Sequence, residues 1–294
     1  MNINYDFSHL PKSALTGKPV LHFAHANGMP SLVYQPLFNK LEAYFTVEYI
    51  ALFGATSGYE VDEHWNNLRQ QLIDNVTAAC KKHEVPHVVG FGHSLGALST
   101  LRAIYKQPDL FSQAVLCDPP MIQGITSFIW HMAKQLDKLP LFDNTFMDKL
   151  SPAGISKKRR DVWESREEAK QSFSKNRFFA KFDPRCLDGY VQHGLIERAD
   201  GKFTLAIPKK NEVAIFRTNP SWYWLTPNRA PKAPVTLIIG EDSLFLKRKF
   251  PQIIEKRLKI PFKVHTGGHM FPLEYPDSVV EMALDIFNTQ QSSN

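Results

Sequence analysis

A serine set between two glycines is the feature that most constrains this chain. Gly92, Ser94 and Gly96 form a G-x-S-x-G pattern directly after the apolar run 87–91 and directly before the helix-prone run 95–105. At a sharp strand-to-helix turn a serine presents its hydroxyl outward, and the two glycines let neighbouring backbone pass without a Cβ clash. The helix start also aims N–H groups at that point. The context predicts a nucleophile, with a purely structural turn as the alternative.

Short apolar runs alternate with amphipathic stretches on both sides of this turn, which is typical of βαβ units. The predicted strands are Pro19–His25, Phe45–Ala51, His87–His93, Ser112–Asp118, Val235–Gly240 and Phe262–His265. The predicted helices are 64–83, Leu95–Tyr105 and Pro276–Phe287. We therefore predict an α/β fold with a mainly parallel sheet flanked by helices.

The alternation stops at Pro119-Pro120 and resumes after the Pro- and Lys-rich stretch 227–234. We predict a core made of 1–120 and 231–294, and a mostly helical cap at 121–230 inserted after the strand that follows the serine turn. The predicted cap elements are helices Ile125–Leu136, Lys157–Gln171 and Arg185–His193 and a short strand in Lys202–Ile207. The cap holds 19 Lys and Arg against 12 Asp and Glu, which indicates either attraction of an anionic substrate or a solvated surface.

A histidine suited to be the general base follows the last predicted strand. His269 stands after Gly267 and Gly268, in a loop that can reach the carboxyl edge of the sheet. Imidazole can take and return a proton near neutral pH. The order of an internal serine and a late histidine matches hydrolases on this scaffold. We predict that His269 activates Ser94.

The oxyanion hole needs two backbone N–H groups. The first is expected from Leu95, the residue after the nucleophile. The second is expected from the turn after the first strand, where Gly28 permits the bend and Pro30 has no N–H to give. Met29 is the predicted donor, with Asn27 as the alternative.

Two aspartates end suitable strands and compete for the role of triad acid. Asp118 follows the strand next to the nucleophile strand, whereas Asp242 follows the strand after the insertion. In the commonest hydrolase pattern the acid stands three residues after the strand-ending glycine, Gly240, and that position is Ser243. We therefore favour Asp118 and keep Asp242 as the alternative acid.

Taken together, His25–Pro30, Gly92–Gly96, the two aspartates and Gly267–Pro272 resemble the α/β-hydrolase superfamily. The segments Ala24–Gly28 and Phe178–Leu195 are similar to fungal peroxisome-type hydrolases that include acyl-CoA hydrolases and a lipase. Some of these place the acid after the strand next to the nucleophile, which supports Asp118. Dehalogenases and epoxide hydrolases of this fold use an aspartate at the elbow, and Ser94 argues against both.

The resemblance implies a serine hydrolase that cleaves a carboxylic ester or thioester with an apolar acyl group through an acyl-enzyme intermediate. An acyl-CoA thioesterase, a C–C bond hydrolase and a noncatalytic ligand-binding relative are the alternatives. Basic runs at Lys157–Arg160 and Lys209–Lys210 suit either CoA phosphates or a solvated face. Large apolar side chains expected in the cap core or pocket are Ile129, Trp130, Phe146, Phe178, Phe179, Trp222, Tyr223 and Trp224.

No metal, cofactor or nucleic-acid partner is predicted. His83–His87 matches H-E-x-x-H by letters, but Pro86 breaks the continuous helix that a zinc site needs. The three cysteines lack paired spacing, and no apolar run reaches the roughly 18 residues of a membrane span. We expect a cytoplasmic protein, because the first twenty residues lack the pattern of an export signal. The expected partner is a small-molecule ester or thioester substrate. The oligomeric state is left open.

Overall fold

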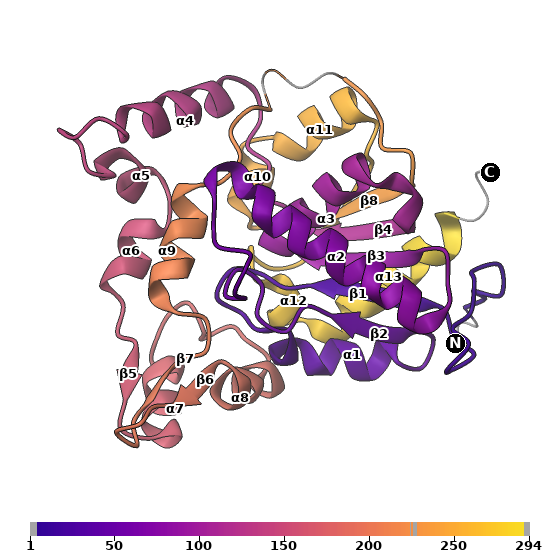
Figure 1. The fold of residues 1–294 in the computed structure, drawn as a ribbon, viewed down its shortest axis with the longest axis horizontal. Coiled ribbons are helices and arrows are strands. Elements are labelled where there is room, and N and C mark those ends of the chain that lie inside the picture. Colours follow the sequence, from indigo (N-terminus) through magenta and orange to yellow (C-terminus); the bar gives the residue numbers. More distant parts are fainter. Residues whose placement is uncertain (1–4, 224, 226–227, 291–294) are drawn as a thin grey trace.

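Six parallel strands form the main sheet, in the order β2-β1-β3-β4-β8-β9. The computed structural model describes residues 5–223, 225 and 228–290, and Figure 1 shows its architecture. The strands are β1 Val20–Ala24, β2 Thr46–Tyr49, β3 Val88–His93, β4 Phe111–Cys117, β8 Val235–Gly240 and β9 Phe262–His265. The six predicted strands are confirmed. Because all of them are parallel, their carboxyl ends meet at one edge, where ligands bind in open α/β sheets.

Helices cover both faces of the sheet. Phe23 and Phe91 pack on one face with residues of α1 (Gln35–Leu41) and α13 (Pro276–Thr289). The other face is covered by α2 (Asn66–His83), α3 (Leu95–Lys106) and α11 (Phe250–Leu258). Burial on both faces explains why the central strands β1, β3, β4 and β8 read as largely apolar runs. The shorter helices of this part are η1 Ser31–Tyr34, η2 Glu63–Trp65, η3 Pro108–Leu110, α10 Leu244–Lys247 and α12 Phe271–Glu274.

Residues 119–234 connect β4 to β8, and we call them the β4–β8 segment. Its helices are α4 Gly124–Leu136, α5 Thr145–Leu150, α6 Ala153–Lys158, α7 Arg166–Ser174, α8 Pro184–His193 and α9 Lys209–Arg217. A small antiparallel sheet contains β5 Val162–Trp163, β7 Phe203–Leu205 and β6 Leu195–Glu197, in that order. Figure 1 shows most of these elements grouped beside the main sheet.

The predicted helix Lys157–Gln171 is wrong. Helix α6 ends at Lys158, the chain is extended through β5, and α7 begins only after Ser165. The side chain of Ser165 accepts a hydrogen bond from the Glu168 N–H, which is the signal of a helix start. The β-branched and aromatic residues of β5 pair with β7. A capping serine and a strand pairing therefore divide what periodicity reads as one helix.

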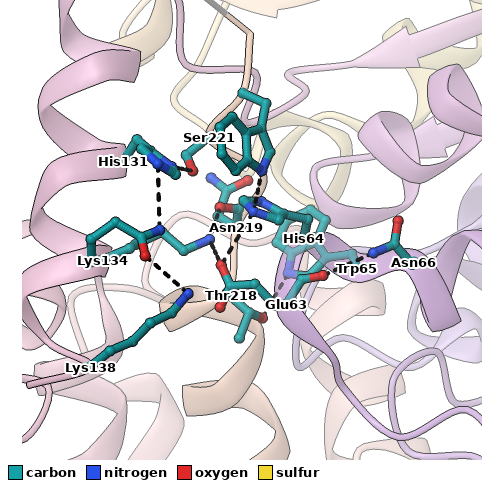
Figure 2. Close-up of polar contacts among 12 residues, drawn as sticks. Glu63, His64, Trp65, Asn66, His131, Lys134, Lys138, Thr218, Asn219 and Ser221 are labelled. Carbon is teal, nitrogen blue, oxygen red and sulfur yellow. Dashed lines mark hydrogen bonds and ion pairs between the residues drawn. The ribbon is translucent and has the colours of Figure 1, made fainter.

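Buried polar side chains tie both ends of the β4–β8 segment to the core. Lys134 of α4 forms an ion pair with Glu63 and donates a hydrogen bond to the Asn219 carbonyl, 2.9 Å away. His131 hydrogen-bonds Ser221 through Nδ1 at 3.1 Å. In Figure 2 these side chains gather between α4, the loop before α2 and the chain after α9. We call Glu63, His64, His131, Lys134, Asn219 and Ser221 the junction cluster.

The loop of this cluster has an unusual backbone. His64 and Trp65 have φ angles of 64° and 57°, in the left-handed region that residues other than glycine seldom adopt. The His64 N–H donates to the Thr218 carbonyl at 3.1 Å, and the Trp65 indole donates to Ile215 and Thr218. This backbone delays the start of α2 to Asn66, two positions after the predicted start at 64.

Candidate active site

Ser94 stands at a strained turn between β3 and α3. Its φ and ψ are 52° and −113°, and its N–H donates to the Cys117 carbonyl at 2.9 Å. A Cβ on Gly96 would lie 2.0 Å from the Ala24 carbonyl oxygen, and one on Gly92 would lie 2.8 Å from the Ala97 nitrogen. Both glycines are therefore required by close backbone approach, as the sequence indicates. The strain holds the Ser94 hydroxyl at the carboxyl edge of the sheet.

Three predicted site residues lie in one hydrogen-bonded chain. The Ser94 Oγ is 2.9 Å from His269 Nε2, and His269 Nδ1 is 2.5 Å from Asp118 Oδ2. Asp118 is fully buried, whereas the His269 side chain is 36% exposed. Since a carboxylate only accepts, Nδ1 carries the proton and Nε2 of the neutral ring can accept from the Ser94 hydroxyl. The geometry allows a proton to pass from Ser94 to His269.

Asp242, the alternative acid, does not join this chain. Its side chain is 62% exposed and lies 3.8 Å from Lys247. Ser243 instead turns inward, with its Oγ 2.7 Å from Asp118 Oδ2. Of the two aspartates, the structure thus brings only Asp118 to His269.

The elbow residue His93 connects two parts of the site. Its Nε2 lies 2.9 Å from the His269 carbonyl oxygen, and its Nδ1 lies 2.7 Å from the Tyr34 hydroxyl. Tyr34 in turn accepts from the Ala26 N–H at 3.3 Å. Burial, reinforced by the nearby His269, lowers the pKa of His93 to about 3, so the ring is neutral. A neutral ring donates through Nε2 and accepts the Tyr34 proton at Nδ1.

The structure does not support Met29 as the second oxyanion donor. The Met29 N–H donates to the Ala26 carbonyl at 3.1 Å and closes a turn in which Gly28 has a φ of 74°. A donor engaged in its own turn cannot also serve an oxyanion at full strength. Asn27, at the bend of the turn, and Met29 both line the same cavity as Ser94. Leu95, as the first residue of α3, has no partner for its N–H within that helix.

This turn is held from both sides. His25 Nδ1 lies 2.7 Å from the Ala26 carbonyl, while its Nε2 accepts from the Phe53 N–H at 2.6 Å. The Asn27 side chain donates to the Glu212 carbonyl of α9 at 3.0 Å. The Glu212 carboxylate is buried and bound by Ser156 and Arg159, each at 2.7 Å. The turn after β1 therefore contacts the β4–β8 segment directly.

A cavity of about 560 Å³ opens above Ser94, His269 and Leu95. Most of its lining residues belong to the β4–β8 segment, and most of the lining surface is apolar. Those predicted as large apolar groups and found in the wall are Trp130, Phe178 and Phe179. Phe146 packs near Trp130, Tyr223 is in the core, and Ile129 and Trp222 are partly exposed. Trp224 lies outside the described residues.

The histidines of the H-E-x-x-H match are not arranged as a zinc site. His83 is the last residue of α2 and hydrogen-bonds Ser13 and Glu48. Within residues 5–223, 225 and 228–290, no group of three or more His, Cys, Asp or Glu side chains could hold a metal ion. No helix in that same part of the chain is long and apolar enough to cross a membrane.

The family assignment follows from this fold and from a family model. The model of the alpha/beta hydrolase family matches residues 23–282, and the chain belongs to that family. The assignment agrees with the parallel sheet, the serine elbow and the late histidine loop.

Two curated fungal proteins are similar to this chain. An ethanol acetyltransferase 1 of Hanseniaspora uvarum is 27% identical over 236 residues, which are 74% of this chain and 60% of that protein. A type I acyl-CoA thioesterase of Penicillium roqueforti is 26% identical over 58% of this chain and 38% of that protein. The chain thus spans less than two thirds of the length of these relatives.

Solved structures share the fold at low identity. A peroxisomal alpha-beta-hydrolase of Saccharomyces cerevisiae has a TM-score of 0.69 at 15% identity, covering 94% of this chain and 79% of that one. An E-2-(acetamidomethylene)succinate hydrolase has a TM-score of 0.66 at 18% identity, with 91% of each chain covered. A thioesterase domain from the curacin biosynthetic pathway has a TM-score of 0.64 at 15% identity, again over 91% of each chain.

Proposed function

We propose that this chain is a serine hydrolase that cleaves a carboxylic ester or thioester with an apolar acyl group. The observation that carries the proposal is the hydrogen-bonded chain Ser94–His269–Asp118 at the floor of a largely apolar cavity. A buried carboxylate, an imidazole and a hydroxyl in this order form the arrangement that activates serine for acyl transfer.

In the proposed acylation step, the Ser94 Oγ attacks the substrate carbonyl carbon while its proton moves to His269 Nε2. Asp118 keeps the Nδ1 proton in place and stabilises the imidazolium. The N–H groups of Leu95 and Asn27 hold the negative carbonyl oxygen of the tetrahedral intermediate. When the intermediate collapses, His269 returns the proton to the leaving oxygen or sulfur, and the acyl group stays on Ser94.

Deacylation repeats these steps with water as the nucleophile. His269 takes a proton from the water, the hydroxide adds to the acyl carbon, and Ser94 leaves with the proton returned by His269. The carboxylic acid is then free to dissociate. No residue beyond the same triad and the same two N–H groups is needed.

The β4–β8 segment acts in this proposal as a cap that selects the acyl group. Leu150 and Ile155 of its short helices and the aromatic Phe178 contribute apolar walls around the nucleophile. An apolar wall favours a medium or long acyl chain or an aromatic ring over a charged acid.

A thioester is the second candidate substrate, favoured by the fungal relative named as an acyl-CoA thioesterase. The basic runs of the cap give it less support than the sequence suggested. Arg159 pairs with Glu212, Arg160 with Glu168, and Lys209 with Asp161. Because these cations already have acidic partners, CoA phosphates would compete with them. Hydrolysis that is insensitive to salt would agree with this pairing, and a steep fall with salt would favour phosphate binding.

Hydrolysis of p-nitrophenyl esters of increasing chain length, and of the matching acyl-CoA esters, tests the proposal. The wild type is compared with Ser94→Ala and with Ser172→Ala, since Ser172 also lines the cavity but lies on α7. We expect activity that rises with chain length, survives Ser172→Ala and is lost in Ser94→Ala. Equal activity of Ser94→Ala and the wild type would refute the proposal.

A further inference from the structure

Ser243 occupies the position where the commonest hydrolase pattern places the acid, three residues after Gly240. Its hydroxyl oxygen lies 2.7 Å from Asp118 Oδ2, and the residue is 1% exposed. The same Oδ2 accepts the Nδ1 proton of His269 at 2.5 Å. One oxygen atom of a buried carboxylate thus receives both donors.

The direction of the hydrogen bond from Ser243 is fixed by its neighbours. An ionised carboxylate can only accept, so the hydroxyl proton points to Asp118. The Ser243 oxygen meanwhile accepts from the Phe245 N–H at 3.2 Å, as the N-cap of α10. With its proton and a lone pair both engaged, the hydroxyl has one orientation.

The backbone around Ser243 is fixed relative to the histidine loop. The Asp242 N–H donates to the Gly267 carbonyl at 2.9 Å. At Gly240, an added Cβ would lie 2.3 Å from the Gly268 carbonyl oxygen, so the end of β8 and the loop before His269 pack backbone to backbone. A movement of Ser243 would therefore displace the loop that carries the imidazole.

Asp118 depends on these two donors. Its Oδ1 has no hydrogen-bond partner among the described residues, and its backbone has a φ of 45°. Without a second donor, only the contact to His269 would fix the rotation of the carboxylate. A buried charge with so few hydrogen bonds is costly, and each one that remains matters.

We propose that Ser243 is a positioning residue that holds the Asp118 carboxylate against His269. This inference rests on the proposed function. It also explains how the acid can stand after β4 while the usual acid position, after β8, is occupied by a hydroxyl. Asp118, after β4, supplies the carboxylate that contacts His269, and Ser243, after β8, donates a hydrogen bond to that carboxylate.

The first test is the rate of fluorophosphonate labelling as a function of pH, which needs no known substrate. We expect Ser243→Ala to label about tenfold more slowly, which is the loss of roughly one hydrogen bond to a charged group. The pH profile of labelling should also change, because Asp118 Oδ2 without the serine donor interacts more strongly with the Nδ1 proton of His269. The downfield NMR signal of the His269 Nδ1 proton should shift as well.

Matched variants separate positioning from simple structural damage. Ser243→Thr keeps the hydroxyl and the N-cap and should label like the wild type. Ser57→Ala, at an exposed position outside the cavity, should leave the pH profile unchanged. His93 and Glu274, the other titratable groups near His269, are the same in all variants.

The second test moves the acid. Asp118→Gly removes the carboxylate and tolerates the positive φ at that position. A carboxylate at position 243 is one bond longer than the serine hydroxyl, so it can reach the space vacated by Oδ2. We expect Asp118→Gly to label at least about a thousandfold more slowly, and Asp118→Gly with Ser243→Asp to recover at least tenfold of that loss.

The outcomes are distinct. Wild-type labelling rate and pH profile in folded Ser243→Ala would overturn the inference while leaving the serine mechanism intact. A folded double variant that labels no faster than Asp118→Gly would also overturn it, and this test still decides if Ser243→Ala fails to fold. A wild type that is not labelled, or a Ser94→Ala variant that is, would overturn the proposed function and this inference together.

Discussion

The candidate active site and the junction cluster both pair a carboxylate with a proton-carrying side chain, but their surroundings differ. At the site, Ser94 and His269 line the cavity and the His269 side chain is 36% exposed. At the junction, Lys134 is 3% exposed, and its ammonium group pairs with Glu63 and donates a hydrogen bond to the Asn219 carbonyl (Figure 2). The chain Ser94–His269–Asp118 thus opens to a cavity, whereas the ammonium group of Lys134 is enclosed by its protein partners. Access to a ligand, more than burial of charge, therefore distinguishes the Ser94–His269–Asp118 chain from the junction cluster.

The largest expected effect is the loss of the acid from the site. Asp118→Asn should lower kcat/KM for an ester by about 10³–10⁴-fold, because His269 loses the partner that fixes its tautomer. Stability should change far less than activity. Asp242→Asn, whose side chain is 62% exposed, is the matched control and should retain activity. The reverse ranking of the two variants in ester hydrolysis would contradict the assignment of the acid.

Removing the charge at the junction should affect stability instead. Lys134→Met leaves Glu63 without its partner and should lower the free energy of unfolding by about 2 kcal/mol, below the usual range for buried pairs because Glu63 is 39% exposed. Lys138→Met, one turn later on an exposed part of the chain, should cost little. Urea denaturation measures both. Adding Glu63→Gln to Lys134→Met should restore part of the loss, and a larger loss in the double variant would contradict the pairing.

Acid should weaken the junction through His64. Burial, with Lys134 and Arg102 nearby, lowers the pKa of His64 to about 3, whereas an unfolded histidine titrates near 6.5. Between these values the unfolded chain binds a proton that the native one does not. Unfolding therefore becomes easier as pH falls, by at most about 1.4 kcal/mol per pH unit for this group.

The variant that isolates this contribution is His64→Asn, since asparagine tolerates the positive φ at that position. It should flatten the pH dependence of the unfolding free energy between about pH 6 and pH 4. His9→Gln, at an exposed position, is the control and should leave the slope unchanged. An unaltered slope in His64→Asn would show that this ring is protonated in the native protein.

The smallest expected effect concerns the open end of the site. Phe178 lines the cavity and is 46% exposed, so Phe178→Ala should remove part of an apolar wall without leaving a closed void. We expect kcat/KM for long-chain esters to fall by about tenfold and that for acetyl esters to change little. Equal losses for both esters would place Phe178 outside acyl recognition.

Much of the fold could be predicted because its signals are local. The central strands β1, β3, β4 and β8 are short, largely apolar runs, and the serine elbow is defined by two glycines that the backbone geometry requires. The helix expected at 157–171 failed because periodicity missed Ser165 as a cap and β5 as a strand. Helix α9 was not predicted, although the carbonyl of its Glu212 accepts a hydrogen bond from Asn27 in the turn after β1.

The finer features of the site depend on contacts between distant residues. The sequence left both Asp118 and Asp242 as candidates for the acid that contacts His269. A shift of one residue at the end of a strand decides whether a side chain points toward the site or toward solvent. It favoured Met29 over Asn27 as the second oxyanion donor. The hydrogen bond from the Met29 N–H to the Ala26 carbonyl, which weighs against Met29, cannot be seen in the sequence. The pairing of Lys134 with Glu63 joins segments with no local signal, and the sequence hints at it only by placing Lys134 four residues after Trp130, on the same face of a helix.

The central claim is that Ser94 is a nucleophile activated by His269 and Asp118. Intact-mass measurement after fluorophosphonate treatment, followed by peptide mapping, tests it most directly. We expect one adduct on Ser94 in the wild type, none in Ser94→Ala, and slow labelling in His269→Ala and Asp118→Asn but not in Asp242→Asn. A folded wild type without an adduct, or an adduct that persists in Ser94→Ala, would contradict it.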